Sequence, residues 1–189
     1  MKKKINIYFN APITLGFVMI SLVALILNFI TKGYTNHLLF ATYKASIFDP
    51  LMYLRLFTHI FGHADITHFM NNMMFILLLG PILEEKYHEK LIYIILSVAF
   101  ITGLFHNLFS NTALLGASGV VFAFILLASI TGKDEGIPIT LIIIAIFWIG
   151  NEIINGFMNH DNVSQMTHII GGISGAGLGL LFKNKNFNE

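Results

Sequence analysis

Residues 114–130 read LLGASGVVFAFILLASI, an almost unbroken apolar stretch that carries Ser118 near its start, with Gly116 and Gly119 close by. A stretch of this kind, without a charged residue, is typical of a helix surrounded by lipid or by other apolar helices. The rest of the chain has the same character, because 56% of its 189 residues are hydrophobic, 11% are charged and the mean hydropathy is +0.75. This composition predicts an all-α integral membrane protein with a single domain, residues 1–189.

Six apolar segments are long enough to be candidates for membrane-spanning helices, which need about 20 residues each. They are residues 13–30, 67–83, 91–109, 115–130, 139–154 and 165–182. Charged or turn-forming residues separate the segments, so we expect a bundle of six transmembrane helices. The first segment is long and no small-residue cleavage site clearly follows it, which favours a retained helix over a signal peptide.

The basic residues indicate how the helices are oriented, because Lys and Arg are retained on the cytoplasmic side. With the N-terminus inside, eight of the eleven basic residues fall in cytoplasmic segments. We therefore expect both termini in the cytoplasm, including a short polar tail at 183–189. The long loop at 31–66, between the first two helices, then lies outside, and its apolar and aromatic residues place it partly in the membrane interface.

Ser118 is the first candidate for chemistry. Glycines on both sides leave its hydroxyl and backbone N–H open to a substrate, and a helix beginning near Ser118 would direct its positive dipole end at a reacting carbonyl oxygen. The motif is not the Gly-x-Ser-x-Gly elbow of soluble hydrolases, which needs a preceding strand. A small-residue helix contact is the other interpretation of the same tetrapeptide.

His168 opens the sixth apolar segment and precedes Gly171, Gly175 and Gly179, which lie at four-residue spacing. Such a stripe lets a helix pack at close range, so His168 could reach Ser118 as a general base. By the predicted orientation both residues lie near the outer ends of their helices. A structural histidine that caps a helix is the alternative.

His68 and Asn72 lie four residues apart in the second segment and therefore share a helix face. Both side chains can donate a hydrogen bond, and two donors that converge in a dry site can stabilise an oxyanion. Hydrogen bonds that simply fasten helices together are the alternative.

Taken together, the Gly116–Gly119 tetrapeptide, the His168–Gly171–Gly175–Gly179 pattern and the His68–Asn72 pair resemble the signature motifs of the rhomboid intramembrane serine proteases. The resemblance covers residues 55–181 and includes Phe57-Thr58-His59, His63 and Glu84. It implies a rhomboid-like bundle of six transmembrane helices.

The resemblance implies roles for these residues. Ser118 would be the nucleophile and His168 the general base of a dyad, while His68, Asn72 and the Ser118 backbone N–H would form the oxyanion hole. The supporting residues would be Gly116, Gly119, Phe122, Gly171, Gly175 and Gly179, with the Phe122 ring against His168. The implied substrates are transmembrane segments of other proteins in a bacterial cell membrane, cut near its outer face, and membrane lipids are the implied surroundings.

Three positions depart from the family pattern. Leu54 precedes Arg55 where a Trp is frequent, Thr167 precedes the histidine where Ala is frequent, and Phe122 stands where many bacterial members have a Tyr. Ring stacking on His168 survives the last change, but a hydroxyl hydrogen bond does not.

Other classes of function fit less well. The chain has no cysteine, no His-Glu-x-x-His motif and a net charge of +1, so we expect no metal, no cofactor and no nucleic-acid partner. Its aspartates fall in loops or at segment ends, where an aspartyl intramembrane protease would need them within the membrane. The main rival is a non-catalytic rhomboid-like protein that binds and guides transmembrane segments. Glu152 could face water, a substrate gap or His160.

Overall fold

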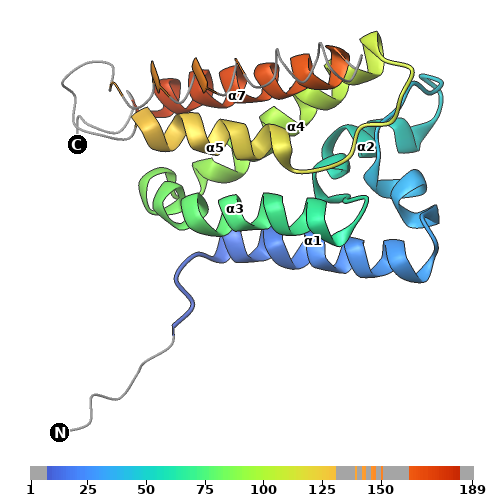
Figure 1. Ribbon diagram of the computed structural model, residues 1–189, viewed down its shortest axis with the longest axis horizontal. Helices are drawn as coiled ribbons and strands as arrows, with labels where there is room; N and C mark the ends of the chain where they lie inside the picture. Colours follow the sequence, from blue (N-terminus) through green and yellow to red (C-terminus); the bar gives the residue numbers. More distant parts are fainter. Residues whose placement is uncertain are drawn as a thin grey trace, which may run out of the picture.

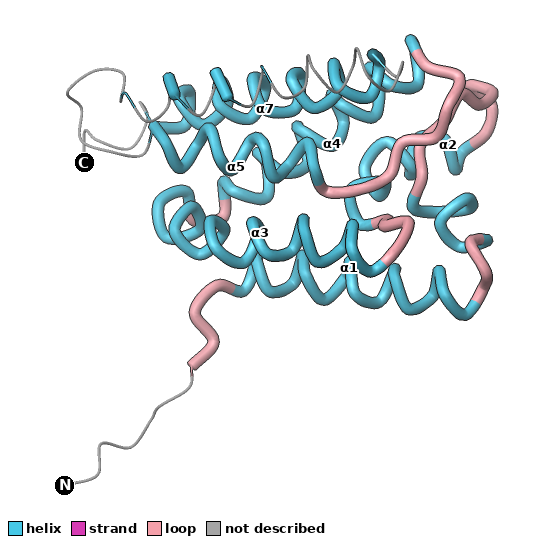
Figure 2. The backbone as a smooth tube through the Cα atoms, viewed as in Figure 1, coloured by secondary structure: helices cyan, strands magenta, loops and turns pink. Residues whose placement is uncertain are grey.

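The structure is a computed structural model that describes residues 8–130, 139, 142–143, 146–147, 150 and 162–183. Its helices, in chain order, are α1 (Pro12–Ile30), η1 (Asn36–Phe40), α2 (Pro50–Thr58), η2 (His59–Phe61), α3 (Ile66–Tyr87), α4 (Lys90–Phe109), α5 (Ser118–Ile130) and α7 (Asn162–Lys183). Within this part of the chain the only β-type pairing is one antiparallel bridge between Thr42 and Leu114. The expected all-α architecture is confirmed for these residues (Figures 1 and 2).

Among the residues that the structure describes, three helices have the length and hydropathy of a membrane span. They are α1, α3 and α4, whose most apolar stretches have mean hydropathies of 2.5, 1.5 and 1.9. Ser118–Ile130 and Met166–Phe182 are apolar but shorter. Most of the fifth apolar segment, including Glu152, lies outside the described residues, as do His160 and the tail beyond Lys183. The count of six spans, the cytoplasmic termini and the single-domain extent therefore stay predictions.

Helices α1 and α3 run side by side (Figure 1). The buried carboxylate of Glu84 links the end of α3 to the start of α1. Glu84, near the end of α3, accepts hydrogen bonds from the Ile13 backbone N–H at 2.8 Å, the Thr14 backbone N–H at 2.9 Å and the Thr14 hydroxyl at 2.8 Å. The first amides of a helix have no partner within it, and a negative charge there interacts favourably with the helix dipole. Glu84 thus acts as the cap that α1 does not find in its own sequence.

The segment between α1 and α3 is folded rather than extended. Asp49 accepts a hydrogen bond from the Leu51 backbone N–H at 2.9 Å, and Pro50 occupies the first turn, so α2 begins here. The guanidinium of Arg55 is buried, bonds to Asp49 at 2.6 Å and lies over the Tyr43 ring at 4.5 Å. The hydrogen bond from Arg55 holds the pKa of the Asp49 carboxyl below its ordinary value. These contacts give the expected outer loop a fixed shape.

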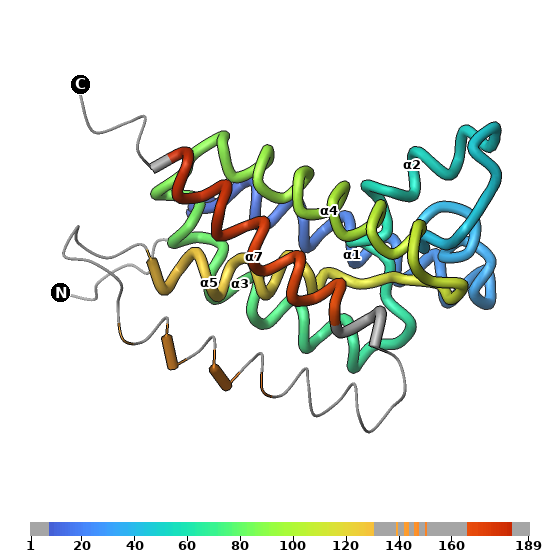
Figure 3. Tube along the Cα trace, turned by 90° about the horizontal axis from the view of Figure 1, so that it is seen from above, coloured from blue at the N-terminus to red at the C-terminus, as the bar shows by residue number. Residues whose placement is uncertain are grey.

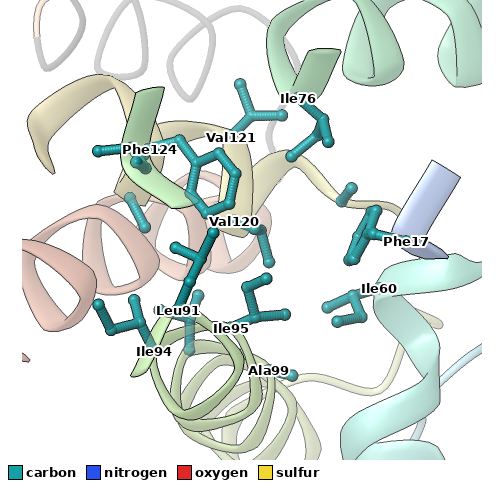
Figure 4. Close-up of a cluster of buried hydrophobic side chains, with 14 of the residues drawn as sticks. Phe17, Ile60, Ile76, Leu91, Ile94, Ile95, Ala99, Val120, Val121 and Phe124 are labelled. Carbon is teal, nitrogen blue, oxygen red and sulfur yellow. The ribbon is translucent and has the colours of Figure 1, made fainter. Parts of the chain in front are cut away.

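The hydrophobic core forms around α4, which lies between α2, α5 and α7 (Figure 3). Leu91, Ile94, Val98 and Ala99 of this helix are fully buried. Figure 4 shows how α4 side chains meet Phe17 of α1, Ile60 of η2, Ile76 of α3 and Val120, Val121 and Phe124 of α5. Side chains from five elements interdigitate in one cluster, so packing against α4 positions the other elements.

The glycine stripe of α7 faces α5. A Cβ on Gly175 would overlap the Ala123 side chain, and one on Gly179 would overlap Leu127. The two helices therefore approach closely along several turns, as Figures 1 and 3 show.

The outward faces of the helices are apolar. Large hydrophobic side chains at least 45% exposed include Met19, Ile20, Val23, Phe29, Ile30, Met70, Met74, Leu78, Ile82 and Tyr93. A soluble monomer seldom exposes so much continuous apolar surface, whereas lipid covers it favourably. The structure and the sequence agree on an integral membrane protein.

Candidate active site

Ser118 lies at the start of α5, at the end of a connection that runs from α4 back into the bundle (Figures 1 and 2). Two contacts hold that connection. Leu114 exchanges backbone hydrogen bonds of 2.9 and 2.8 Å with Thr42, and the Gly116 N–H donates to the His59 carbonyl at 2.9 Å. Helix α5 therefore begins among the other helices, and its first residue is partly buried.

Gly116 has a backbone conformation that requires glycine. Its φ is +122°, in the region that other residues rarely adopt. A Cβ at this position would also lie 2.6 Å from Nε2 of His68. The left-handed turn explains why the helix begins at Ser118 although the apolar run begins earlier.

The structure brings Ser118 and His168 together from helices fifty residues apart in sequence. The Ser118 Oγ lies 2.8 Å from the His168 Nε2, a normal hydrogen-bond distance. The Phe122 ring, one turn after Ser118, lies with its centroid 5.3 Å from that of the imidazole at an angle of 46°. The imidazole is thus placed between a hydroxyl and an aromatic ring, in a tilted arrangement rather than a parallel stack.

Backbone contact between α5 and α7 sets this distance. A Cβ on Gly171 would lie 2.9 Å from the Cα of Gly119, 3.0 Å from the Gly119 carbonyl oxygen and 3.1 Å from Cγ2 of Thr102. Gly171 is three residues after His168, and Gly119 directly follows Ser118. The two glycines allow the helices to meet where the hydroxyl and the imidazole face each other.

His68 and Asn72 lie together next to Gly116. The position of a Cβ on Gly116 is 2.6 Å from the His68 Nε2 and 3.6 Å from the Asn72 Nδ2. Asp65 caps this end of α3 by accepting from the His68 backbone N–H at 2.8 Å. Both side chains therefore flank the backbone two residues before Ser118, on one side of the connection. Asn72 is buried and His68 is half-buried.

His63 contacts Asn72, a link that the sequence interpretation did not identify. The Asn72 Nδ2 lies 3.1 Å from the His63 Nε2, and the His63 Nδ1 lies 3.1 Å from the Phe61 carbonyl oxygen. Burial lowers the pKa of His63 to about 4, with a smaller contribution from nearby His68, so the ring is neutral at physiological pH. The His63 carbonyl in turn accepts from the side-chain amides of Asn36 and Asn28, at 2.9 and 3.5 Å.

His59 is a second buried imidazole near the site. Its ring nitrogens lie 3.2 Å from the Arg55 carbonyl and 3.4 Å from the Thr102 hydroxyl. Burial lowers the pKa of His59 to about 4. In sequence, His59 and His63 stood out only as histidines that match the family pattern. Their contacts depend on how the loop folds back over α3 and α4, which no local spacing reports.

Within the described residues, no group of three or more His, Asp or Glu side chains is arranged to hold a metal ion.

Comparison with known proteins agrees with the geometry. A family model described as the Rhomboid domain matches residues 50–185, which is more than half of the chain. The rhomboid protease GlpG of Salmonella choleraesuis is 31% identical over 139 residues, covering 69% of this chain and 50% of that protein. The rhomboid protease GlpG of Salmonella newport is 34% identical over 111 residues, covering 54% and 40%.

The chain spans about half the length of the curated relatives it matches. The matched region contains Ser118, His168, His68, Asn72, His59 and His63, whereas Asn28, Asn36 and Thr42 precede it. The chain belongs to the rhomboid family.

Proposed function

We propose that this protein is an intramembrane serine endopeptidase in which Ser118 and His168 form the catalytic dyad. The observation that supports this most directly is the 2.8 Å approach of the Ser118 Oγ to the His168 Nε2. A serine hydroxyl is a weak nucleophile by itself and needs an adjacent base to accept its proton. The family membership and the apolar surroundings support a peptide bond within a membrane as the target.

In the first step His168 Nε2 accepts the Ser118 proton as the Oγ attacks the scissile carbonyl carbon. The resulting tetrahedral intermediate collapses when the C–N bond breaks, and His168 returns the proton to the leaving amine. An ester between Ser118 and the N-terminal fragment remains. Water then attacks this ester, and its proton passes to His168. The bond between the carbonyl carbon and the Ser118 Oγ breaks, His168 returns the proton to the Oγ, and the N-terminal fragment leaves with a new terminal carboxyl group.

The oxyanion of both tetrahedral intermediates is stabilised by the His68 ring, the Asn72 amide and the Ser118 backbone N–H. The location of both side chains beside Gly116 supports this role. Donors fixed in a dry site are worth more than in water because they need no reorganisation as the charge develops. The start of α5 adds a positive dipole end at the same point.

The substrate is a transmembrane segment of another protein, locally unwound so that its carbonyl can reach Ser118, because an intact helix uses its backbone groups internally. We propose that it enters beside the fifth span, and that water reaches the dyad from the outer face of a bacterial cell membrane. This assignment includes six spans in one domain, with both termini cytoplasmic and lipid around the bundle.

The test is cleavage of a transmembrane substrate by purified protein in detergent or liposomes. Ser118→Ala should abolish cleavage, whereas Ser129→Ala should not. Ser129 is on the same helix and its hydroxyl donates to the Ile125 carbonyl at 2.8 Å, so it controls for the loss of a hydroxyl. Undiminished cleavage by Ser118→Ala would reject the assignment.

A fluorophosphonate probe separates the protease from the rhomboid-like protein that only guides transmembrane segments. We expect labelling at Ser118 that disappears in His168→Ala. Folded wild-type protein that takes up no label would favour the guiding function.

A further inference from the structure

His63 is held firmly on three sides. Its carbonyl accepts a hydrogen bond of 2.9 Å from Asn36 in η1 and a longer one of 3.5 Å from Asn28 in α1. Its Nδ1 faces the Phe61 carbonyl, and its ring packs edge-on against Phe69 at 5.4 Å. The side chain is fully buried, so α1 and the loop together determine the direction in which its remaining nitrogen points.

These contacts fix which ring nitrogen carries the proton. The Phe61 carbonyl can only accept, so the His63 Nδ1 must donate. In the neutral ring the Nε2 is then an acceptor, and its partner is the Asn72 Nδ2 at 3.1 Å. The Asn72 amide therefore presents its nitrogen, not its oxygen, to His63.

The orientation of the Asn72 amide decides whether it can serve an oxyanion. An amide nitrogen carries two hydrogens, so one can bond to His63 while the other stays available toward the space beside Gly116. The Asn72 Nδ2 lies 3.6 Å from the position of a Gly116 Cβ. If the amide were rotated by half a turn, its oxygen would occupy this location and would repel a developing negative charge.

We propose that His63 is a positioning residue for the reaction, whose Nε2 accepts one hydrogen of the Asn72 amide and so keeps the other directed at the oxyanion. The proposal rests on the function proposed above, because it assumes that Asn72 stabilises the tetrahedral intermediate. Asn36 and Asn28 extend the chain of contacts by anchoring the His63 backbone. The series of hydrogen bonds thus runs from α1 and η1 through His63 to Asn72 on α3.

The two amide side chains separate the contacts of His63. His63→Gln places an acceptor oxygen where the Nε2 stood but loses the bond to Phe61. His63→Asn keeps a donor near the Nδ1 position but reaches no further, so Asn72 loses its acceptor. We therefore expect His63→Gln to keep most of the kcat and His63→Asn to lose it. KM should stay near the wild-type value, because the oxyanion contact forms only in the transition state.

A double-mutant cycle with Asn72→Ala gives the decisive measurement. Loss of one oxyanion donor lowers kcat by about a hundredfold to a thousandfold. If His63 acts through Asn72, His63→Asn should lower kcat in the native background and have little further effect in Asn72→Ala. His88→Asn, at the exposed end of α3 where φ is +50°, is a matched control that should leave kcat unchanged.

The outcomes distinguish a failure of the His63 proposal from a failure of the proposed Ser118–His168 dyad. If Ser118→Ala still cleaves, the proposed dyad fails. Two results would overturn the positioning role while cleavage still depends on Ser118. In one, the fold-losses of kcat from His63→Asn and Asn72→Ala multiply in the double mutant. In the other, His63→Asn retains wild-type kcat. Thermal unfolding shows whether His63→Asn folds. If it does not, His63→Gln carries the same cycle, and a kcat as low as that of Asn72→Ala would reject the role.

Discussion

Gly171→Ala tests whether backbone contact between α5 and α7 sets the Ser118–His168 distance. The added Cβ would lie 2.9 Å from the Gly119 Cα and 3.0 Å from the Gly119 carbonyl oxygen. Carbon atoms pack best at about 3.5–4.0 Å, so α7 has to move away from α5 by about 0.5–1 Å. A flexible side chain could turn aside, but these neighbours are backbone atoms of a helix and cannot.

The shift acts directly on the proposed dyad, because His168 lies less than one turn from Gly171. The Ser118 Oγ to His168 Nε2 distance of 2.8 Å would lengthen past the usual hydrogen-bond range. Displacement of a catalytic group by about 1 Å can lower the rate by roughly a hundredfold, so we expect kcat to fall by about tenfold to a hundredfold. Crowding costs about 1–3 kcal/mol of stability, of which better helix propensity recovers about 0.5–1 kcal/mol.

Initial cleavage rates of a transmembrane substrate in detergent, with thermal unfolding of the same samples, measure both effects. Gly177→Ala is the matched control. It lies on the same helix, and a Cβ there meets nothing within 4 Å, so this variant should gain slightly in stability and keep its kcat. A Gly171→Ala protein with wild-type kcat and unchanged unfolding would refute the argument that the glycine contact positions the dyad.

Two further predictions concern stability. Glu84→Gln should lower the free energy of unfolding by about 1–3 kcal/mol, because the amide loses the charge and turns its NH₂ toward one of the Ile13 and Thr14 donors. Thermal unfolding measures this change. An unchanged midpoint would contradict the role of Glu84 as the cap of α1. The second concerns acid, because His59 and His63 have pKa values lowered from 6.5 to about 4 by burial. Above pH 6.5 both rings are neutral in the folded and the unfolded protein, and stability is at its full value. As the pH falls toward 4, the unfolded protein binds protons that the buried rings do not, so stability drops by on the order of 3 kcal/mol for each ring. Unfolding midpoints recorded across this range should drop steeply, with a shallower drop for His63→Gln, and a flat profile would count against the buried neutral rings.

The apolar segments predicted the long helices α1, α3, α4, α5 and α7 well, whereas η1, α2 and η2 lie in the segment that was predicted as a loop. The differences at the ends of the long helices have local causes. The second segment was expected to end at residue 83, but α3 continues to Tyr87 because the buried Glu84 carboxylate must remain on the helix to reach α1. The fourth was expected to begin at residue 115, but the positive φ of Gly116 delays the helix to Ser118. Hydropathy reports which residues avoid water, and it does not report a carboxylate used as a cap or a glycine in a left-handed turn.

Relations within one helix were also predictable from spacing. His68 with Asn72, and Ser118 with Phe122, each share a face because they lie four residues apart. Close approach between helices was predictable only where small residues such as Gly171 make it possible. A glycine stripe indicates close packing, but it does not show which helix is the partner. The loop contacts had no such signal. Nothing in the sequence pairs Asn36 with His63, since this bond forms only after the loop folds against α1 and α3.

The proposed dyad and the proposed oxyanion hole are therefore held by different contacts. Van der Waals contact between two glycine backbones brings Ser118 close to His168, and backbone hydrogen bonds from Leu114 to Thr42 and from Gly116 to His59 hold the segment before Ser118. The Asn72 amide depends instead on a neutral imidazole and on hydrogen bonds from Asn36 and Asn28. Added volume at Gly171 should therefore reduce kcat and probe labelling together through the proposed dyad, because both need the activated serine. Altering the polar contacts of His63 should instead reduce kcat only where the Asn72 amide is present to be misdirected.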